Sequence, residues 1–138
     1  MSERKWLPTV AELIDRLSIH QLKEVFVVEF KEKYAVEIAD IMHDLDLLIN
    51  EQNIQISARL IRAIVVLSQI NAHIWYNESA ARQGNNSGDN NLMLTHGLNG
   101  IRHRMINIIL EEIGMEERKD AKIDCLASEF KDWHISMK

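Results

Sequence analysis

The sequence predicts an all-α protein: a single-domain bundle of four to five helices over residues 1–138, with one long central helix. Three observations predict this class. The chain has only one proline and five glycines, so few residues interrupt helices. Its apolar residues recur with a period near 3.6 rather than 2. A length of 138 residues suits one domain with a sizeable core.

The segment from Pro8 to Glu12 predicts the start of the first helix. Thr9 and Glu12 have the T-x-x-E spacing of a capping box, in which each side chain satisfies a backbone N–H at the helix start. We expect this helix to run from Val10 to about Lys33. The V-F-V-V run has strand propensity, but no turn signal flanks it, so we expect it to stay helical. Its apolar face would continue through Val25, Phe26, Val28 and Phe30.

Two further helices are expected before the middle of the chain. Tyr34 to Asn50 is helical by its apolar spacing, and whether it continues the first helix stays open, since nothing between Glu32 and Ala35 breaks a helix. Asn50 to Asn53 reads as a turn. Ile56 to Gln83 is then the central, most buried helix. Its apolar body surrounds Leu60, Ile61, Ile64, Val65, Leu67, Ile70 and Ile74.

The second half of the chain begins with a low-complexity stretch. Gln83 to Asn91, Q-G-N-N-S-G-D-N-N, predicts a flexible loop. Leu92 to Ile113 is the next expected helix, ended by Gly114 as a C-terminal cap. A shorter helix is expected from about Glu117 to Trp133, on which Lys119 to Asp124 would be a solvated face.

Composition narrows the function classes. A net charge of −5 argues against non-specific nucleic-acid binding, which needs a basic face. The longest apolar run, Ala63 to Leu67, is far short of the roughly 20 residues that span a bilayer. Cys125 is the only cysteine, which fits a reducing interior. We therefore expect a cytoplasmic protein without a membrane partner.

Polar residues interrupt both long helices of the second half. One stripe of the central helix holds Ser68, Asn71, Trp75, Glu78 and Arg82, and the next helix holds His96, Asn99, His103 and Asn107 with Arg102 alongside. Asparagine is costly inside helices because its amide competes for the backbone, so a compensating role is expected. These groups could bond one another across a helix interface, line a pocket, or simply face solvent.

In the pocket interpretation, cationic side chains bind an anionic group of a ligand. Amide side chains hydrogen-bond its polar edges, and an indole ring stacks on it. The predicted ligand-binding residues are Arg16, Lys23, Asn71, Trp75, His96, Asn99 and Arg102.

Two catalytic patterns are present but incomplete. The pairs Glu29/Glu32 and Glu37/Asp40 are similar to the acidic pairs with which all-α nucleotide pyrophosphohydrolases bind magnesium, but in that family the pairs lie on separate antiparallel helices. The doublet His43-Asp44 loosely resembles the metal-binding set of HD-type phosphohydrolases. Such a set would need His20 upstream and Asp120 or Asp124 downstream. We assign no catalytic residue, metal ligand or cofactor.

The block I-D-R-L-S-I-x-x-L-K, from Ile14 to Lys23, resembles the hallmark of a helical domain family encoded in tailed-phage genomes and bacterial surface-polysaccharide gene clusters. The stretches N-A-H-I-W-Y-N-E from Asn71, T-H-G-L-N-G-I-R from Thr95 and K-D-A-K-I-D-C-L from Lys119 are similar to its phage-borne members. The resemblance implies a small helical protein of phage or bacterial cytoplasm, and no reaction comes with it. The residues it favours are Asp15, Arg16, Lys23, Asn71, Asn77, His96, Asn99, Arg102, Lys119 and Asp124.

The leading hypothesis is a non-enzymatic, oligomeric binding protein that holds a small anionic ligand. A phage-like origin suggests a nucleotide or cyclic-nucleotide signal of host defence, which the protein would sequester. Metal-dependent nucleotide hydrolysis is the enzyme alternative. In a third hypothesis the polar stripes bury against a sister subunit and no small ligand exists.

Overall fold

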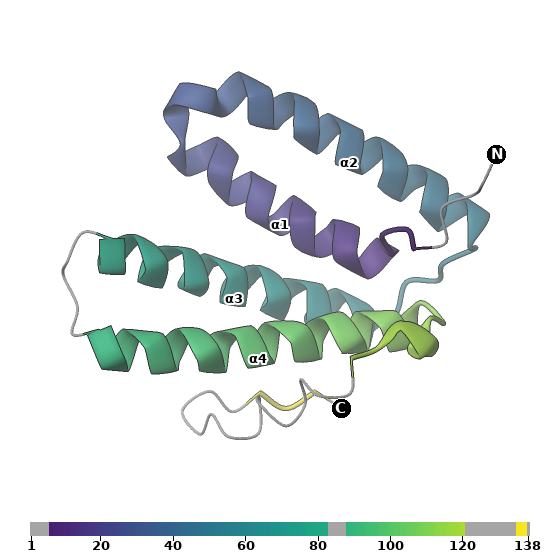
Figure 1. The fold of residues 1–138 in the computed structure, drawn as a ribbon. Coiled ribbons are helices and arrows are strands. Elements are labelled where there is room, and N and C mark those ends of the chain that lie inside the picture. The colour runs from purple at the N-terminus through teal and green to yellow at the C-terminus, as the bar shows by residue number, and fades with distance from the viewer. Residues whose placement is uncertain (1–5, 83–87, 121–134, 138) are drawn as a thin grey trace. The chain divides into compact units, whose positions relative to one another are not determined.

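The computed structural model describes residues 6–82, 88–120 and 135–137. Over these residues the protein is all-α, with four α-helices, two short 3-10 turns and no strand (Figure 1). The chain divides into two compact units, Met1–Ile54 and Gln55–Lys138, each of which holds one pair of helices. The expectation of a single domain stays a prediction.

The first unit is an antiparallel helix hairpin, α1 (Val10–Phe26) and α2 (Lys31–Glu51), seen as the purple and blue ribbons of Figure 1. Thr9 caps α1 as predicted, because its Oγ1 accepts a hydrogen bond from the Glu12 N–H at 3.1 Å. Buried apolar residues from both helices form the core of the hairpin. They include Val10, Ala11, Leu13, Ile41 and Leu45.

The predicted end of the first helix is wrong. Val27 leaves the helical region at φ −105° and ψ 76°, and a 3-10 turn, η1 (Val28–Phe30), reverses the chain into α2. β-Branched residues restrict their own side chains in a helix, so the V-F-V-V run lowers the cost of ending one there. The expected apolar face also fails, since Val25, Phe26, Val28 and Phe30 are all exposed, Val28 by 73%.

The predicted turn at Asn50 to Asn53 is confirmed only at Gln52 and Asn53, because α2 continues through Glu51. Asn53 adopts the left-handed conformation at φ 50°, which asparagine tolerates better than most residues. The Ile54 N–H donates to Ile49 O at 3.1 Å and the Asn53 N–H to Asn50 O at 3.3 Å. This pair of bonds is a Schellman motif, which satisfies carbonyl groups left over at the end of α2.

The second unit is also an antiparallel hairpin, formed by α3 (Ala58–Arg82) and α4 (Gly88–Glu112) (Figure 1). Ser57 caps the start of α3, since its Oγ accepts from the Leu60 N–H at 3.0 Å. Ile61 and Val65, predicted to be core residues, are exposed by 53% and 51%. The core is contributed by both helices. It contains Leu60, Ala63, Val66, Leu67, Ile70, Leu98, Ile101, Met105, Ile108, Ile109 and Leu110.

The predicted loop at Gln83 to Asn91 is too long at its second end, because α4 already begins at Gly88. Asparagine and aspartate are accepted at helix starts as readily as in loops, so composition alone did not separate the two. Residues 83–87 of that prediction lie outside the described residues.

Gly114 ends α4 as predicted, at φ 82°. The Met115 N–H donates to Leu110 O at 2.8 Å and the Gly114 N–H to Glu111 O at 3.2 Å, a second Schellman motif. A 3-10 turn, η2 (Glu116–Arg118), follows where the shorter helix was expected to begin, and Lys119 is extended. Residues 121–134 of that expected helix are outside the described ranges.

Residues near the C-terminus lie against the second hairpin. Arg104 Nη1 donates to Ile135 O at 3.3 Å, and Arg62 donates to Ser136 O. None of the helices described here is both long enough and apolar enough to cross a lipid bilayer.

Candidate functional site

The register of α3 against α4 is fixed by side-chain bonds near both ends of the hairpin. Asn77 Nδ2 donates to Thr95 Oγ1 at 2.6 Å, and Ser57 Oγ donates to Glu112 Oε1 at 2.5 Å. In an antiparallel pair, each residue advances about 1.5 Å along α3 in one direction and along α4 in the opposite direction. The two bonds therefore fix which residues of α3 and α4 lie at the same height along the hairpin. Asn71 is then level with the turn of α4 that holds Asn99 and Arg102.

The same register brings Trp75 level with His96. Five of the seven predicted ligand-binding residues therefore lie at neighbouring levels of one hairpin. Asn71 is buried, with 4% of its surface exposed, whereas Trp75, Asn99 and Arg102 are half-buried and His96 is exposed. The level of each residue follows from the backbone, and a shared pocket stays a prediction.

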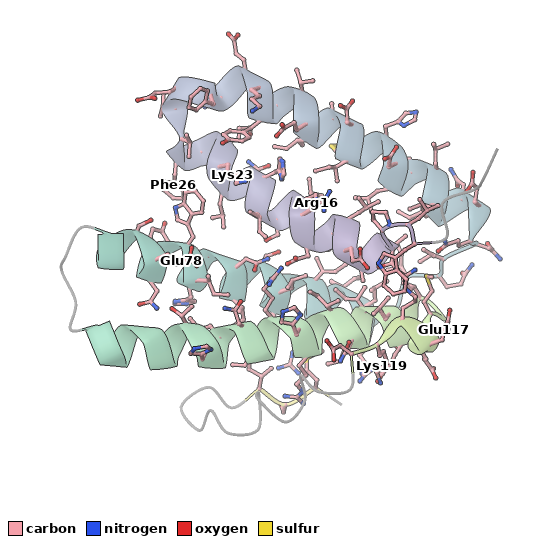
Figure 2. All side chains as sticks on the ribbon, viewed as in Figure 1. Arg16, Lys23, Phe26, Glu78, Glu117 and Lys119 are labelled. Atoms are coloured by element: carbon pink, nitrogen blue, oxygen red, sulfur yellow. The ribbon has the colours of Figure 1, made fainter. Side chains whose placement is uncertain are left out.

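The remaining two predicted residues belong to the first unit. Arg16 and Lys23 are spaced along α1, and Arg16 is exposed (Figure 2). Lys23 is half-buried, and its Nζ lies 5.7 Å from the centre of the Tyr34 ring, within the range of a cation–π interaction. That these two cations bind the same ligand as the five residues of the second unit is likewise a prediction.

Lys23 is part of a polar cluster between α1 and α2, which we call the His20 cluster: His20, Lys23, Tyr34 and Glu37. His20 Nε2 lies 3.0 Å from Glu37 Oε2, and its Nδ1 lies 3.0 Å from Arg16 O. The rings of His20 and Tyr34 meet edge to face, with centroids 6.0 Å apart. Both ring nitrogens of His20 therefore lie within hydrogen-bond distance of an oxygen.

Sequence reasoning did not find the His20 cluster. In a continuous helix His20 and Tyr34 would lie about 21 Å apart, because each residue adds 1.5 Å. The reversal at Val27 brings them into contact instead. The available signal was the β-branched run itself, which marks the position of the reversal without a glycine or a proline.

Two buried asparagines of the second unit bond to other elements, whereas mutual bonding between the amides and imidazoles of the two predicted stripes stays a prediction. Asn77 is buried and donates from α3 to Thr95 on α4. Asn107 is buried and pairs with the backbone of Asp120: its Nδ2 donates to Asp120 O at 2.8 Å, and its Oδ1 accepts from the Asp120 N–H at 3.0 Å. These two amides therefore hold the second unit together.

Charged residues gather at the end of the second hairpin where α3 begins and α4 ends. Arg59 Nη1 lies 3.0 Å from Glu111 Oε2 and 3.4 Å from Glu112 Oε2, and Lys119 donates to Glu111 Oε1. The Lys119 hydrogen bond, helped by Arg59, holds the pKa of Glu111 below its usual value of 4.5 against the opposing effect of partial burial. Lys119 is thus half-buried and paired, although the sequence predicted a solvated helix face.

The acidic pairs do not meet as the hydrolase pattern requires. Glu29 lies in η1, whereas Glu32, Glu37 and Asp40 share α2 rather than two facing helices. Across the described parts of the chain, no group of three or more His, Cys, Asp or Glu side chains is arranged to hold a metal ion.

The second catalytic pattern falls largely on exposed or undescribed residues. His43 Nδ1 lies 3.3 Å from Asp44 Oδ1, and both side chains are mostly exposed. His20 is paired with Glu37, and Asp124 and Cys125 lie outside the described residues.

No protein-family model, curated protein or solved structure matches this chain.

Proposed function

We propose that this protein is a non-enzymatic binding protein that holds a small anionic ligand. A nucleotide or cyclic-nucleotide host-defence signal is the proposed ligand class, and sequestration is the proposed role. The observation that supports this most is the register of α3 and α4, which brings Asn71, Trp75, His96, Asn99 and Arg102 to neighbouring levels of one hairpin.

The chemistry of these side chains suits a planar anion. Arginine offers a fork of N–H donors that matches phosphate oxygens, an indole stacks on a base, and an amide both donates and accepts along a base edge. In the first unit, Arg16 and Lys23 add positive charge, with Lys23 already held in place over Tyr34. Binding of this kind needs neither a nucleophile nor a metal.

Thermal shift and titration calorimetry against a panel of mononucleotides, dinucleotides and cyclic nucleotides test the proposal. A ligand at 100 times its Kd stabilises the folded state by about 2.7 kcal/mol, which a melting curve detects. Arg16→Ala and Arg102→Ala should each weaken binding at least tenfold. Lys33→Ala removes an exposed cation outside the proposed site and should bind like the wild type.

Two outcomes overturn the proposal. One is the absence of any stabilising nucleotide in the panel. The other is an affinity that Arg16→Ala, Arg102→Ala and Lys33→Ala lower equally, which would indicate general attraction of anions rather than a site.

A second candidate, an oligomeric interaction protein, is favoured by the tip of the first hairpin. Five large apolar residues near this tip are about half exposed or more, and a cluster of exposed apolar residues is typical of an interaction site. Exposed charges of both signs, including Glu29, Lys31, Glu32 and Lys33, surround them and suit a contact between two identical copies. The apolar tip residues are Val25, Phe26, Val28, Phe30 and Val36.

Light scattering over a dilution series tests this candidate. Phe30→Asp should lower the mean mass at high concentration, whereas Ile56→Asp, at an exposed apolar residue of the other unit, should leave it unchanged. A wild-type mass that is monomeric at every concentration contradicts the candidate.

A further inference from the structure

The first unit contains a hollow of about 240 Å³ that none of the seven predicted ligand-binding residues lines. Its walls come from the segment before α1, from Leu13 on α1, and from the last turns of α2. Five of its residues are apolar and two are acidic. The lining residues are Leu7, Pro8, Leu13, Asp44, Leu47, Leu48 and Glu51.

The acidic residues lie at two levels of this apolar hollow. Asp44 and Glu51 are seven residues apart on α2, which places them on one face with a rise of about 10 Å between them. Leu47 and Leu48 lie between them in sequence, and Leu7 and Leu47 are about half exposed. Apolar surface therefore remains open to solvent beside two carboxylates.

The negative charge of the hollow indicates that its ligand carries a positive charge. Both polar groups of the lining are carboxylates, and Asp44 keeps most of its side chain exposed beside His43. A carboxylate offers about four acceptor sites, so one histidine contact leaves Asp44 able to accept more bonds. The hollow is thus suited to a cation with an apolar stem.

Size narrows the occupant further. Pockets for drug-sized molecules hold about 300 to 1,000 Å³, so 240 Å³ suits one large side chain better than a whole metabolite. Arginine combines an apolar stem with a weakly hydrated cation whose planar fork matches carboxylates. We propose that this hollow binds an arginine side chain presented by a partner protein. The site is separate from the proposed anionic-ligand site and opposite to it in charge preference.

The probe is the capped tripeptide acetyl-Leu-Arg-Leu-amide, titrated into the ¹⁵N-labelled full chain and followed by NMR. Amide shifts should move for Leu13, Leu47, Leu48 and Glu51. The same peptide with citrulline in place of arginine has nearly the same shape without charge. Because an exposed ion pair contributes up to about 1 kcal/mol, citrulline should bind up to about fivefold more weakly.

Two matched double variants distinguish binding in the hollow from a general effect of the net charge of the protein. The double variant Asp44→Asn/Glu51→Gln should weaken the arginine peptide about fivefold, and both positions are exposed, so the fold should persist. The double variant Asp40→Asn/Asp46→Asn removes the same charge from exposed positions of α2 outside the lining and should bind like the wild type.

Three results overturn the assignment. The first is a citrulline peptide that binds as tightly as the arginine peptide. The second is an equal loss in both double variants. The third is a lysine peptide that binds more tightly than arginine, which would favour a compact ammonium over the planar fork. Nucleotide binding plays no part in these measurements, so their outcome does not depend on the anionic-ligand proposal.

Discussion

Replacing Asn107 by alanine tests the structural role that the fold gives to this amide. Asn107 is buried in α4, with 4% of its surface exposed. Its side chain makes one hydrogen bond in each direction with the backbone of Asp120, at 2.8 and 3.0 Å. These bonds hold the chain that follows η2 against α4. We expect Asn107→Ala to release that segment and to lower the free energy of unfolding.

The magnitude follows from two opposing terms. Each lost hydrogen bond costs about 0.5 to 1.5 kcal/mol net, so the pair costs about 1 to 3 kcal/mol. Alanine is the better helix former by about 0.6 kcal/mol, which offsets part of the loss. Asp120 is exposed, so water replaces some of what its backbone loses. The expected net destabilisation is about 0.5 to 2.5 kcal/mol.

Urea unfolding followed by circular dichroism measures this loss, and hydrogen exchange localises it. The Asp120 amide should exchange faster in Asn107→Ala by more than the global loss of stability explains. Asn99→Ala, at a half-buried position of the same helix, is the matched control and should be neutral or slightly stabilising. An Asn107→Ala protein as stable as the wild type, with unchanged Asp120 protection, would refute the structural role.

Three other perturbations have defined outcomes. Because its pKa is lowered in the folded state, Glu111 contributes stability that is present above pH 4.5 and lost as the pH falls through the folded value. Glu111→Gln should reduce this dependence in urea titrations from pH 6 to about pH 3, by less than about 1 kcal/mol for a partly exposed pair; an unchanged profile contradicts the Lys119 pairing. Gly114→Ala should cost about 1 to 2 kcal/mol in urea unfolding, since a Cβ at φ 82° meets no atom within 4 Å and the whole penalty is left-handed backbone strain. A double-mutant cycle with His20→Ala and Glu37→Ala should give a coupling of about 0.5 to 2 kcal/mol, and additive losses would show that the 3.0 Å contact contributes nothing.

The helices were predictable where local signals decide the structure. Thr9 marks a helix start through its side-chain oxygen and Gly114 a helix end through its backbone, both by bonds to neighbouring residues, and both predictions are confirmed. The reversal at Val27 was not predicted, because it depends on what α1 and α2 gain by packing together. A β-branched run only lowers the cost of that reversal. Tertiary packing therefore decided the one boundary that creates the His20 cluster.

The candidate site shows the same limit at the level of side chains. Helical spacing groups Asn71 with Trp75 and places Arg102 alongside the stripe of Asn99, but spacing along one helix carries no register between helices. The bonds of Asn77 to Thr95 and of Ser57 to Glu112 supply that register. Burial was also hard to foresee at Ile61 and Val65, which continue an apolar pattern yet face solvent.

The helix asparagines now divide by role, and this changes which residues carry the ligand proposal. An asparagine inside a helix lowers stability, so we expect each one to make a compensating interaction. Asn77 and Asn107 receive it from Thr95 and from the Asp120 backbone. Amides as a class are therefore poor evidence for a ligand in this protein. The proposal depends more on the chemistry of its charged and aromatic groups, the Arg16 and Arg102 guanidinium groups and the Trp75 indole, which suit an anion with a planar base.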